Sequence, residues 1–128
     1  KSWASGVGVM GSTIGVVGTM EGECSFDTRS DRSTIASHGG TDAFALFVDN
    51  HLGDVVWAVA IGGASQDTAT DVAMCPNGGV YVLGEMGPGE GMLAVNGKSV
   101  PVREAGRTDP DVFVAHINSE GKPNWIQA

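Results

Sequence analysis

Residues 42–57 read DAFALFVDNHLGDVVW, and residues 111–125 read DVFVAHINSEGKPNW. Both stretches begin with Asp-x-Phe, pass through a turn that contains glycine, and end on Trp. The matched pairs are Asp42 with Asp111, Phe44 with Phe113, Val48 with Ile117, Asp49 with Asn118, Gly53 with Gly121 and Trp57 with Trp125. Upstream, IGVVGTM at 14–20 matches VYVLGEM at 80–86 in the same order. This repetition indicates tandem copies of one structural unit.

The second copy is typical of four short strands joined by turns. The segment CPNGG at 75–79 is a turn signal, because Pro presets one backbone dihedral and Asn-Gly supplies positive φ. β-Branched and aromatic residues at 80–84 favour a strand. Apolar residues alternate along 111–118, as they do in a half-buried strand. The predicted strands are 70–74, 80–84, 111–118 and 123–127, with 85–110 as a long loop.

The first copy predicts the same order of elements. Its strands are expected at 6–10, 13–18, 42–49 and 55–61, and 19–41 is expected to be a long loop. Its first strand is incomplete or irregular, because the segment IGGASQDTAT that precedes the second copy has no counterpart there. Apolar residues at helical spacing are missing, so we expect essentially no helix.

Four antiparallel strands repeated in tandem are the pattern of β-propeller blades. The sequence therefore predicts an all-β fold of about two blades, at 1–61 and 62–128. A blade cannot bury both faces alone, and a closed ring takes about four to eight blades. We expect the chain to be part of a longer propeller or a protomer that completes a ring by association.

Composition and charge narrow the class of partner. The chain holds 7 basic and 15 acidic residues, a net charge of -8, and its basic residues are scattered. Phosphate binding needs clustered Lys and Arg, so nucleic acid is not an expected partner. No apolar run approaches the roughly 20 residues of a membrane span. Low Lys content and acidity favour an extracellular or cell-surface protein.

Taken together, the motifs resemble the bacterial β-propeller repeats called SBBP repeats. The pattern of that family runs from Trp through Gly-Gly and Asp to a GNVYVTG-like strand, a glycine-rich loop, a DxFVAKLD-like strand and the next Trp. The matching segments here are Trp57, Gly62-Gly63, Asp67, Asp71, 78–84, Asn96-Gly97, Gly106, 111–115, Gly121 and Trp125. The family's Lys after FVA is replaced by His116 here.

The resemblance implies a non-catalytic scaffold, extracellular or attached to a surface, with no cofactor and no catalytic residues to transfer. Its expected partners are other blades, protein subunits or glycans. In the repeat pattern Trp3, Trp57 and Trp125 take equivalent places and are expected to pack between blades, while stacking on sugars is the alternative.

The glycines and aspartates of the repeat have predicted structural roles. Gly18 and Gly84 are expected to end the second strand of each unit, and Gly53 and Gly121 to form the turn before the fourth. Asp42 and Asp111 are expected to cap the start of the third strand.

A metal site is the alternative use of the acidic residues. Asp67 and Asp71 are four residues apart and are weak candidates for calcium, which takes 6–8 oxygen ligands. The D-x-[DN]-x-[DN]-G loop does not occur. A calcium-stabilised adhesin therefore stays an alternative to a scaffold without metal.

An enzyme is the second alternative. A propeller-fold glycan hydrolase would need two carboxylates around the scissile bond, and no pair is marked. Ser37-His38 lacks a GxSxG elbow. Cys24 and Cys75 fall in loops at opposite ends of the predicted strands, so a bridge between them is not expected.

The sequence therefore favours a structural or interaction module. The long loops 19–41 and 85–110 carry mixed charge on one face of the predicted scaffold. Because long loops on a rigid scaffold are the usual place for binding, we expect partner contacts there.

Overall fold

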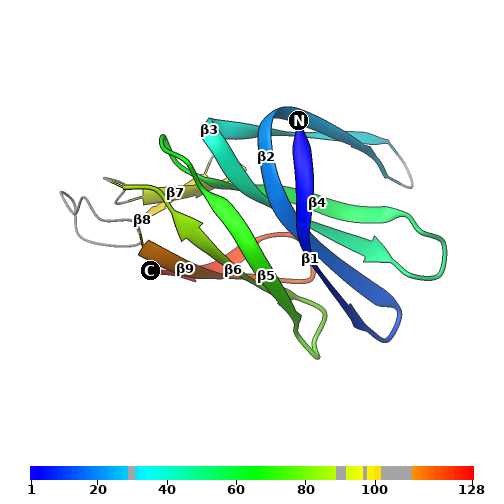
Figure 1. The fold of residues 1–128 in the computed structure, drawn as a ribbon. Coiled ribbons are helices and arrows are strands. Elements are labelled where there is room, and N and C mark those ends of the chain that lie inside the picture. Colours follow the sequence, from blue (N-terminus) through cyan, green and yellow to red (C-terminus); the bar gives the residue numbers. More distant parts are fainter. Residues whose placement is uncertain (29–30, 89–91, 97, 102–110) are drawn as a thin grey trace.

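The described residues form ten strands in two antiparallel sheets, so the predicted all-β class is confirmed (Figure 1). The computed structural model of the chain describes residues 1–28, 31–88, 92–96, 98–101 and 111–128. No helix occurs among these residues, so none is long and apolar enough to span a membrane. Both sheets are open in the part of the chain that the structure describes.

The first sheet has six strands in the order β1-β2-β3-β4-β7-β8, and the second has four in the order β10-β9-β6-β5. The strands of the first sheet are β1 (Ser2–Met10), β2 (Thr13–Asp27), β3 (Arg32–Asp49), β4 (Val55–Gly62), β7 (Met92–Val95) and β8 (Lys98–Pro101). Those of the second are β5 (Thr68–Met74), β6 (Val80–Met86), β9 (Asp111–Ile117) and β10 (Pro123–Gln127).

The sequence repeat is also a repeat of strand pairing. Gly18 pairs with Phe44 between β2 and β3, and Gly84 pairs with Phe113 between β6 and β9. A bulge interrupts β1 opposite Gly18 and interrupts β5 opposite Gly84. We therefore call β1–β4 the first unit and β5, β6, β9 and β10 the second unit.

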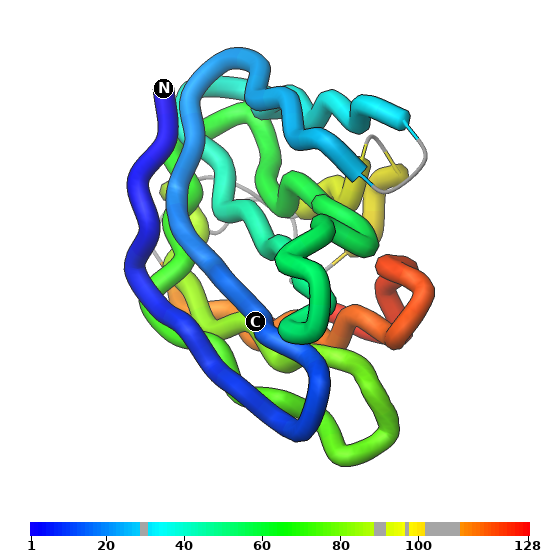
Figure 2. Tube along the Cα trace, turned by 90° about the vertical axis from the view of Figure 1, so that its right-hand side faces the viewer, coloured from blue at the N-terminus to red at the C-terminus, as the bar shows by residue number. Residues whose placement is uncertain are grey.

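Both units are oriented in the same sense. Phe113 faces the first unit and lies in the core between the sheets, whereas its equivalent Phe44 faces away from the second unit. Phe47 of the first unit faces the second, whereas its equivalent His116 lies on the outer side. The turn after β1 and the turn after β5 accordingly lie at the same end of the molecule (Figure 2).

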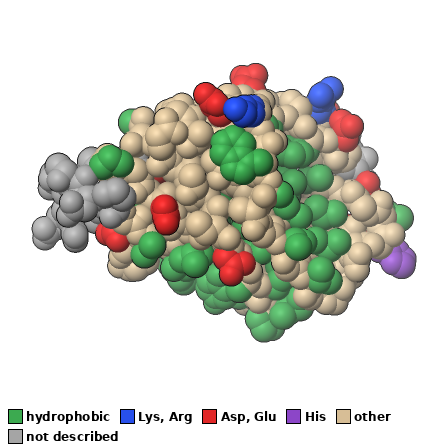
Figure 3. All heavy atoms as spheres, in the orientation of Figure 1, with side chains coloured by type: hydrophobic (Ala, Val, Ile, Leu, Met, Phe, Trp, Pro, Cys, Tyr) green, Lys and Arg blue, Asp and Glu red, His purple; other side chains and the backbone are tan. Residues whose placement is uncertain are grey.

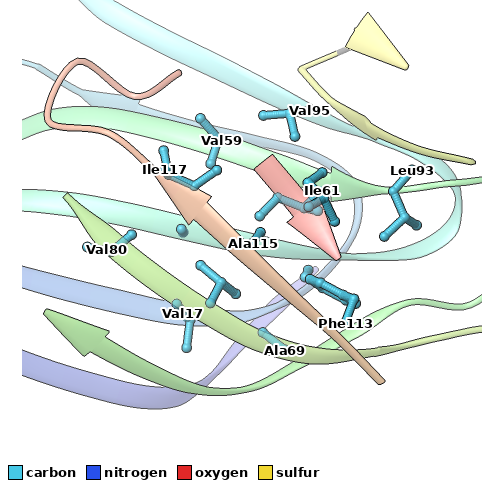
Figure 4. Close-up of a cluster of buried hydrophobic side chains, with 14 of the residues drawn as sticks. Val17, Val59, Ile61, Ala69, Val80, Leu93, Val95, Phe113, Ala115 and Ile117 are labelled. Atoms are coloured by element: carbon cyan, nitrogen blue, oxygen red, sulfur yellow. The ribbon is translucent and has the colours of Figure 1, made fainter. Parts of the chain in front are cut away.

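We call the face that carries Phe44 or Phe113 the front face of its unit, and the opposite face the back face. The front face of the second unit packs on the back face of the first (Figure 4). The core between them is aliphatic and aromatic and includes Val17, Ala45, Phe47, Trp57, Val59, Val80, Val82, Phe113, Ala115 and Ile117.

The expectation of a loop over 19–41 was wrong. β2 continues to Asp27 and β3 begins at Arg32, so most of this segment is a long hairpin (Figure 1). A bulge between Glu21 and Glu23, where Gly22 has a φ of 79°, interrupts the pairing of β2 with β3. Beyond it the hairpin covers part of the first unit's front face, where Ile35 packs with Phe44, Ala58, Ala60 and Met20.

The expectation of a loop over 85–110 was also wrong in part. β7 and β8 form a hairpin that joins the edge of the first unit's sheet, where Ile61 pairs with Val95. Leu93 and Val95 enter the core. The Asn96 side chain accepts a hydrogen bond from the Ala60 N–H at 3.0 Å. Residues predicted as part of the second unit thus extend the first sheet, and 102–110 lie outside the described residues.

We expect any side chain at Gly84 to destabilise the fold, because atoms of two other residues lie close to its Cα. A Cβ there would lie 2.2 Å from the Thr68 carbonyl oxygen and 2.7 Å from the Phe113 ring. We expect Gly84→Ala to lower the free energy of unfolding by about 3 kcal/mol. Urea denaturation measures this loss.

Gly11→Ala is the matched control, since Gly11 has a φ of 58° and no atom within 4 Å of a Cβ. It should cost only about 1 kcal/mol, from backbone strain alone. Equal losses at Gly84 and Gly11 would contradict the packing argument.

Candidate functional site

The back face of the second unit has no protein layer over it among the described residues. Tyr81, Leu83, Val112 and Trp125 are exposed there, although all are large apolar or aromatic side chains. Val114 and His116 lie between them and are half-buried. An exposed apolar face of this kind is a candidate interaction surface. We call these six residues the open back face.

Three aromatic rings form the centre of the open back face. The Tyr81 and His116 rings are stacked with centroids 4.8 Å apart, and the Trp125 ring lies 5.9 Å from His116 and 6.1 Å from Tyr81. β6, β9 and β10 each supply one ring. The rings are therefore held by three neighbouring strands of one sheet.

Hydrogen bonds orient His116 within this cluster. Its Nε2 is 3.5 Å from the Cys75 Sγ, and its Nδ1 is 3.0 Å from the Asn124 Nδ2. A hydrogen bond with Cys75, with the charge of that group as the next cause, raises the pKa of the Tyr81 hydroxyl. Tyr81 is therefore a neutral phenol at physiological pH, and it presents an uncharged ring to a partner.

The equivalent residues of the first unit show what such a face can bind. Phe47 and Trp57 take the places of His116 and Trp125, and their rings are stacked 5.2 Å apart at an interplanar angle of 4°. The Trp57 indole donates a hydrogen bond to the Ser119 carbonyl oxygen at 3.1 Å. Trp57 is only 9% exposed, whereas Trp125 is 44% exposed.

The front face of the first unit is open along β1 and the adjoining part of β2. Val7 and Val9 are 67% and 63% exposed on this side. Hydrophobic side chains gather over the same strands in the space-filling view (Figure 3). We call Val7, Val9, Ile14 and Val16 the open front face; Ile14 and Val16 are half-buried members of it.

Trp3 does not share a place with the other two tryptophans. It lies in β1, where it pairs with Thr19, whereas Trp57 and Trp125 lie in β4 and β10. Pairing makes Trp3 the equivalent of Thr68, which pairs with Glu85 in the second unit. Trp3 is exposed, so the expected equivalence of three tryptophans holds for two of them.

Asp42 is buried within β3, where it pairs with Met20 of β2, so the expectation that it caps the start of this strand was wrong. Its Oδ2 accepts a hydrogen bond from the His38 backbone N–H at 2.9 Å and also contacts the His38 ring Nδ1. Its Oδ1 is buried without a hydrogen-bond partner in the described part of the chain. Burial raises the pKa of Asp42, and the nearby charge of Asp67 adds to this, while the bonds from His38 oppose it.

The Asp67 carboxylate links the connection between β4 and β5 to the residue that follows β6. Its Oδ2 accepts a hydrogen bond from the Gly63 N–H at 2.7 Å, and its Oδ1 accepts one from the Gly87 N–H at 3.1 Å. Asp71 instead accepts a bond from the N–H of its neighbour Val72. Within the described ranges, no group of three or more His, Cys, Asp or Glu side chains could hold a metal ion. A calcium site at Asp67 and Asp71 stays a prediction.

The remaining repeat residues lie at turns and strand starts. Asp111 begins β9, and its Oδ1 accepts a bond from the Val112 N–H at 2.9 Å. Gly53 and Gly121 lie in the turns before β4 and β10, with φ angles of 74° and 81°. Cys24 and Cys75 are free thiols.

Pockets lie beside the sheets, and two of them are lined by described residues. One, of about 390 Å³, is lined by residues 34–38 and Asn96. The other, of about 530 Å³, is lined by residues of the β7–β8 hairpin and of the turn before β10. Among the described residues, the titratable lining is His38 in the first pocket and Lys98 and Lys122 in the second. Neither pocket therefore brings an acid and a base together.

Sequence reasoning missed Tyr81 and His116. The signal was available in the repeat, because Tyr81 replaces Gly15 and His116 replaces Phe47 in the alignment of the two copies. Aromatic residues at positions that face the neighbouring unit could have indicated the open back face. The open back face is thus a candidate site beside the loops, where partner contacts stay a prediction.

Comparisons with known protein families and with curated proteins find no match for this chain. The class of protein rests on the structure, which is all-β with two repeated units. The resemblance to SBBP repeats stays a prediction.

Replacing Trp57 and Trp125 separately tests the difference between the two faces. We expect Trp57→Ala to lower the free energy of unfolding by about 4 kcal/mol, because it removes a buried ring and its hydrogen bond. Trp125→Ala should cost about 1 kcal/mol, since much of that ring is already in water. Urea denaturation at low micromolar protein concentration gives both values, and equal losses would contradict the assignment of faces.

Because the pKa of Asp42 is raised, we expect its contribution to the free energy of unfolding to fall as pH rises. Its folded pKa lies above the unfolded value, so this component is full below pH about 4 and is lost as pH rises through the raised pKa. Asp42→Asn stays neutral and should lack this loss. The difference between the two proteins should change by at most about 1.4 kcal/mol per pH unit. Parallel urea profiles between pH 4 and 7 would contradict the prediction.

Proposed function

We propose that the protein is a non-catalytic structural and interaction module of the propeller-repeat type, extracellular or at the cell surface. Its sheet faces, and not its connecting segments, bind other protein surfaces. The front-to-back packing of the two units carries this proposal.

Front-to-back packing differs from the packing of a simple sandwich. In a sandwich two sheets turn their apolar faces toward each other, and the outer faces are polar. Here Phe113 points toward the first unit while Phe44, its equivalent, points away from the second. Such an arrangement can be continued by further units at either end, as in repeat arrays and propellers.

The chemistry of the open back face favours a protein partner. Tyr81 and Trp125 are of the residue types that are enriched in protein interfaces. Leu83 and Val112 add aliphatic surface with no charge, which suits an apolar partner surface better than a sugar. Acidic residues such as Glu85 lie at the margin, where a polar rim is usual.

Fusion of a third unit tests the proposal. Ala128 is the repeat equivalent of Ala60, because Trp125 matches Trp57. Residues 61–128 appended directly after Ala128 therefore continue the repeat in phase. The added copy carries Met74→Val, because the Met74 side chain that fits over Gly15 would meet the larger Tyr81 there. If the module is extendable, the added unit should cover Trp125 as the second unit covers Trp57.

Trp125 fluorescence gives the readout. The two-unit protein and the three-unit fusion both carry Trp3→Phe. In the fusion the single Trp of the added unit is also changed to Phe, so that only Trp57 and Trp125 emit. Acrylamide quenching of Trp125 should fall about threefold or more in the fusion, toward that of a buried indole. A Trp125→Ala change should then cost about as much as Trp57→Ala, about 4 kcal/mol. An added unit that leaves Trp125 fully quenched would contradict the proposal.

A further inference from the structure

We propose that the open back face of one chain binds the open front face of a second copy, head to tail. This inference rests on the proposed function and names the partner of the same site. Front-to-back packing of two units leaves one unused front face and one unused back face. The two unused faces are of the kinds that already bind each other inside the chain.

The open front face has the residues of a face that binds a back face. Val7, Val9, Ile14 and Val16 are the equivalents of Val72, Met74, Val80 and Val82, by the pairing of β1 with β2 and of β5 with β6. Those four residues of the second unit pack in the core against the first unit. The first unit therefore presents the same aliphatic surface to solvent that the second unit buries.

The turn before β4 matches the turn that receives Trp57. Gly121 lies against Trp57, whose Cγ would be 2.8 Å from a Cβ on that glycine. Gly53 has the same left-handed conformation, and nothing lies within 4 Å of a Cβ placed there. In each turn the glycine N–H donates to the carbonyl of an equivalent residue, Asp49 for Gly53 and Asn118 for Gly121, although the Gly53 turn is one residue longer. The Gly53 turn is thus an unfilled counterpart of the site that holds Trp57.

The substitutions between the copies are complementary in size. In the internal interface Met74 lies over Gly15, and a Cβ there would be 2.7 Å from the Met74 sulfur. In the proposed interface Val9 takes the place of Met74, and Tyr81 takes the place of Gly15. A smaller side chain on the front face thus meets a larger one on the back face.

The β2–β3 hairpin limits the contact but does not prevent it. It covers the β3 and β4 side of the front face around Phe44 and Ala60, both buried. The β1 side, with Val7 and Val9, stays exposed. The interface is therefore smaller than the internal one. Small interfaces between separate chains are typically weak and transient, so we expect a dissociation constant in the micromolar range.

A head-to-tail contact uses two different patches, so it extends into a ring or an open chain. Two variants each remove one patch. Trp125→Arg blocks the back face, and Val9→Lys blocks the front face. Both sites are exposed, so both variants should fold. Circular dichroism checks this, and Met92→Lys, on the exposed edge hairpin, is the matched control.

Sedimentation velocity at 10–100 µM, about the range expected for such an interface, gives the test. The unchanged protein and Met92→Lys should form species larger than a monomer. Trp125→Arg alone and Val9→Lys alone should be monomers. Mixed together they should form a dimer with one chain of each, because one keeps an intact front face and the other an intact back face.

Three other results would overturn the inference. A dimer of Val9→Lys alone would show back-to-back pairing. An unchanged protein that stays monomeric at 100 µM, well above the expected dissociation constant, would exclude a second copy as the partner. Variants that associate as the unchanged protein does would place the contact elsewhere. If these results occur while the three-unit fusion still shields Trp125, the proposed function stands. The partner of the open back face is then a different protein and not a second copy of this chain.

Discussion

A phenylalanine ring held against a glycine on the neighbouring strand is the constraint on which the arrangement of both units depends. Phe44 lies against Gly18 and Phe113 against Gly84, with the same close approach in each unit. A slip of one residue would turn every side chain to the opposite face. Since the aromatic ring fits only where the Cβ is missing, the pair fixes which residues become front and which become back.

This choice of faces explains how similar sequences come to lie in different environments. Ala45 and Val114 are equivalent, yet Ala45 is buried between the sheets and Val114 is half-buried on the outer side. The first unit's back face carries small residues such as Gly15 and Ala45, which allow close packing of the second unit. The second unit's back face carries larger aromatic residues, which suit a different partner surface.

The repeat was predictable because it depends on residues with local signals. Asp-x-Phe, the turn glycines and Trp are visible in both copies. The predicted strands agree with the structure to within a few residues except in the first unit, where the end of β2 and the start of β3 extend far into 19–41. The hairpin over 19–41 was not predictable, because Cys24, Phe26 and Ile35 are too sparse for a periodic pattern. Its strands are stabilised by packing on Phe44 and Ala60, which is a tertiary contact.

The candidate site was hidden for a related reason. Whether a strand residue is buried depends on which face of its sheet is covered by another layer. The alternation of residues along β9 does not show this, because it is equally regular on the buried and the open side. Only the direction of stacking shows that Phe113 is covered and His116 is not. The β2–β3 hairpin and the β7–β8 hairpin both stabilise the first unit, whereas the second unit has no such cover among the described residues. The two ends of the stack therefore differ: the second unit's back face is open, whereas the β2–β3 hairpin covers the β3 and β4 side of the first unit's front face and leaves its β1 side exposed.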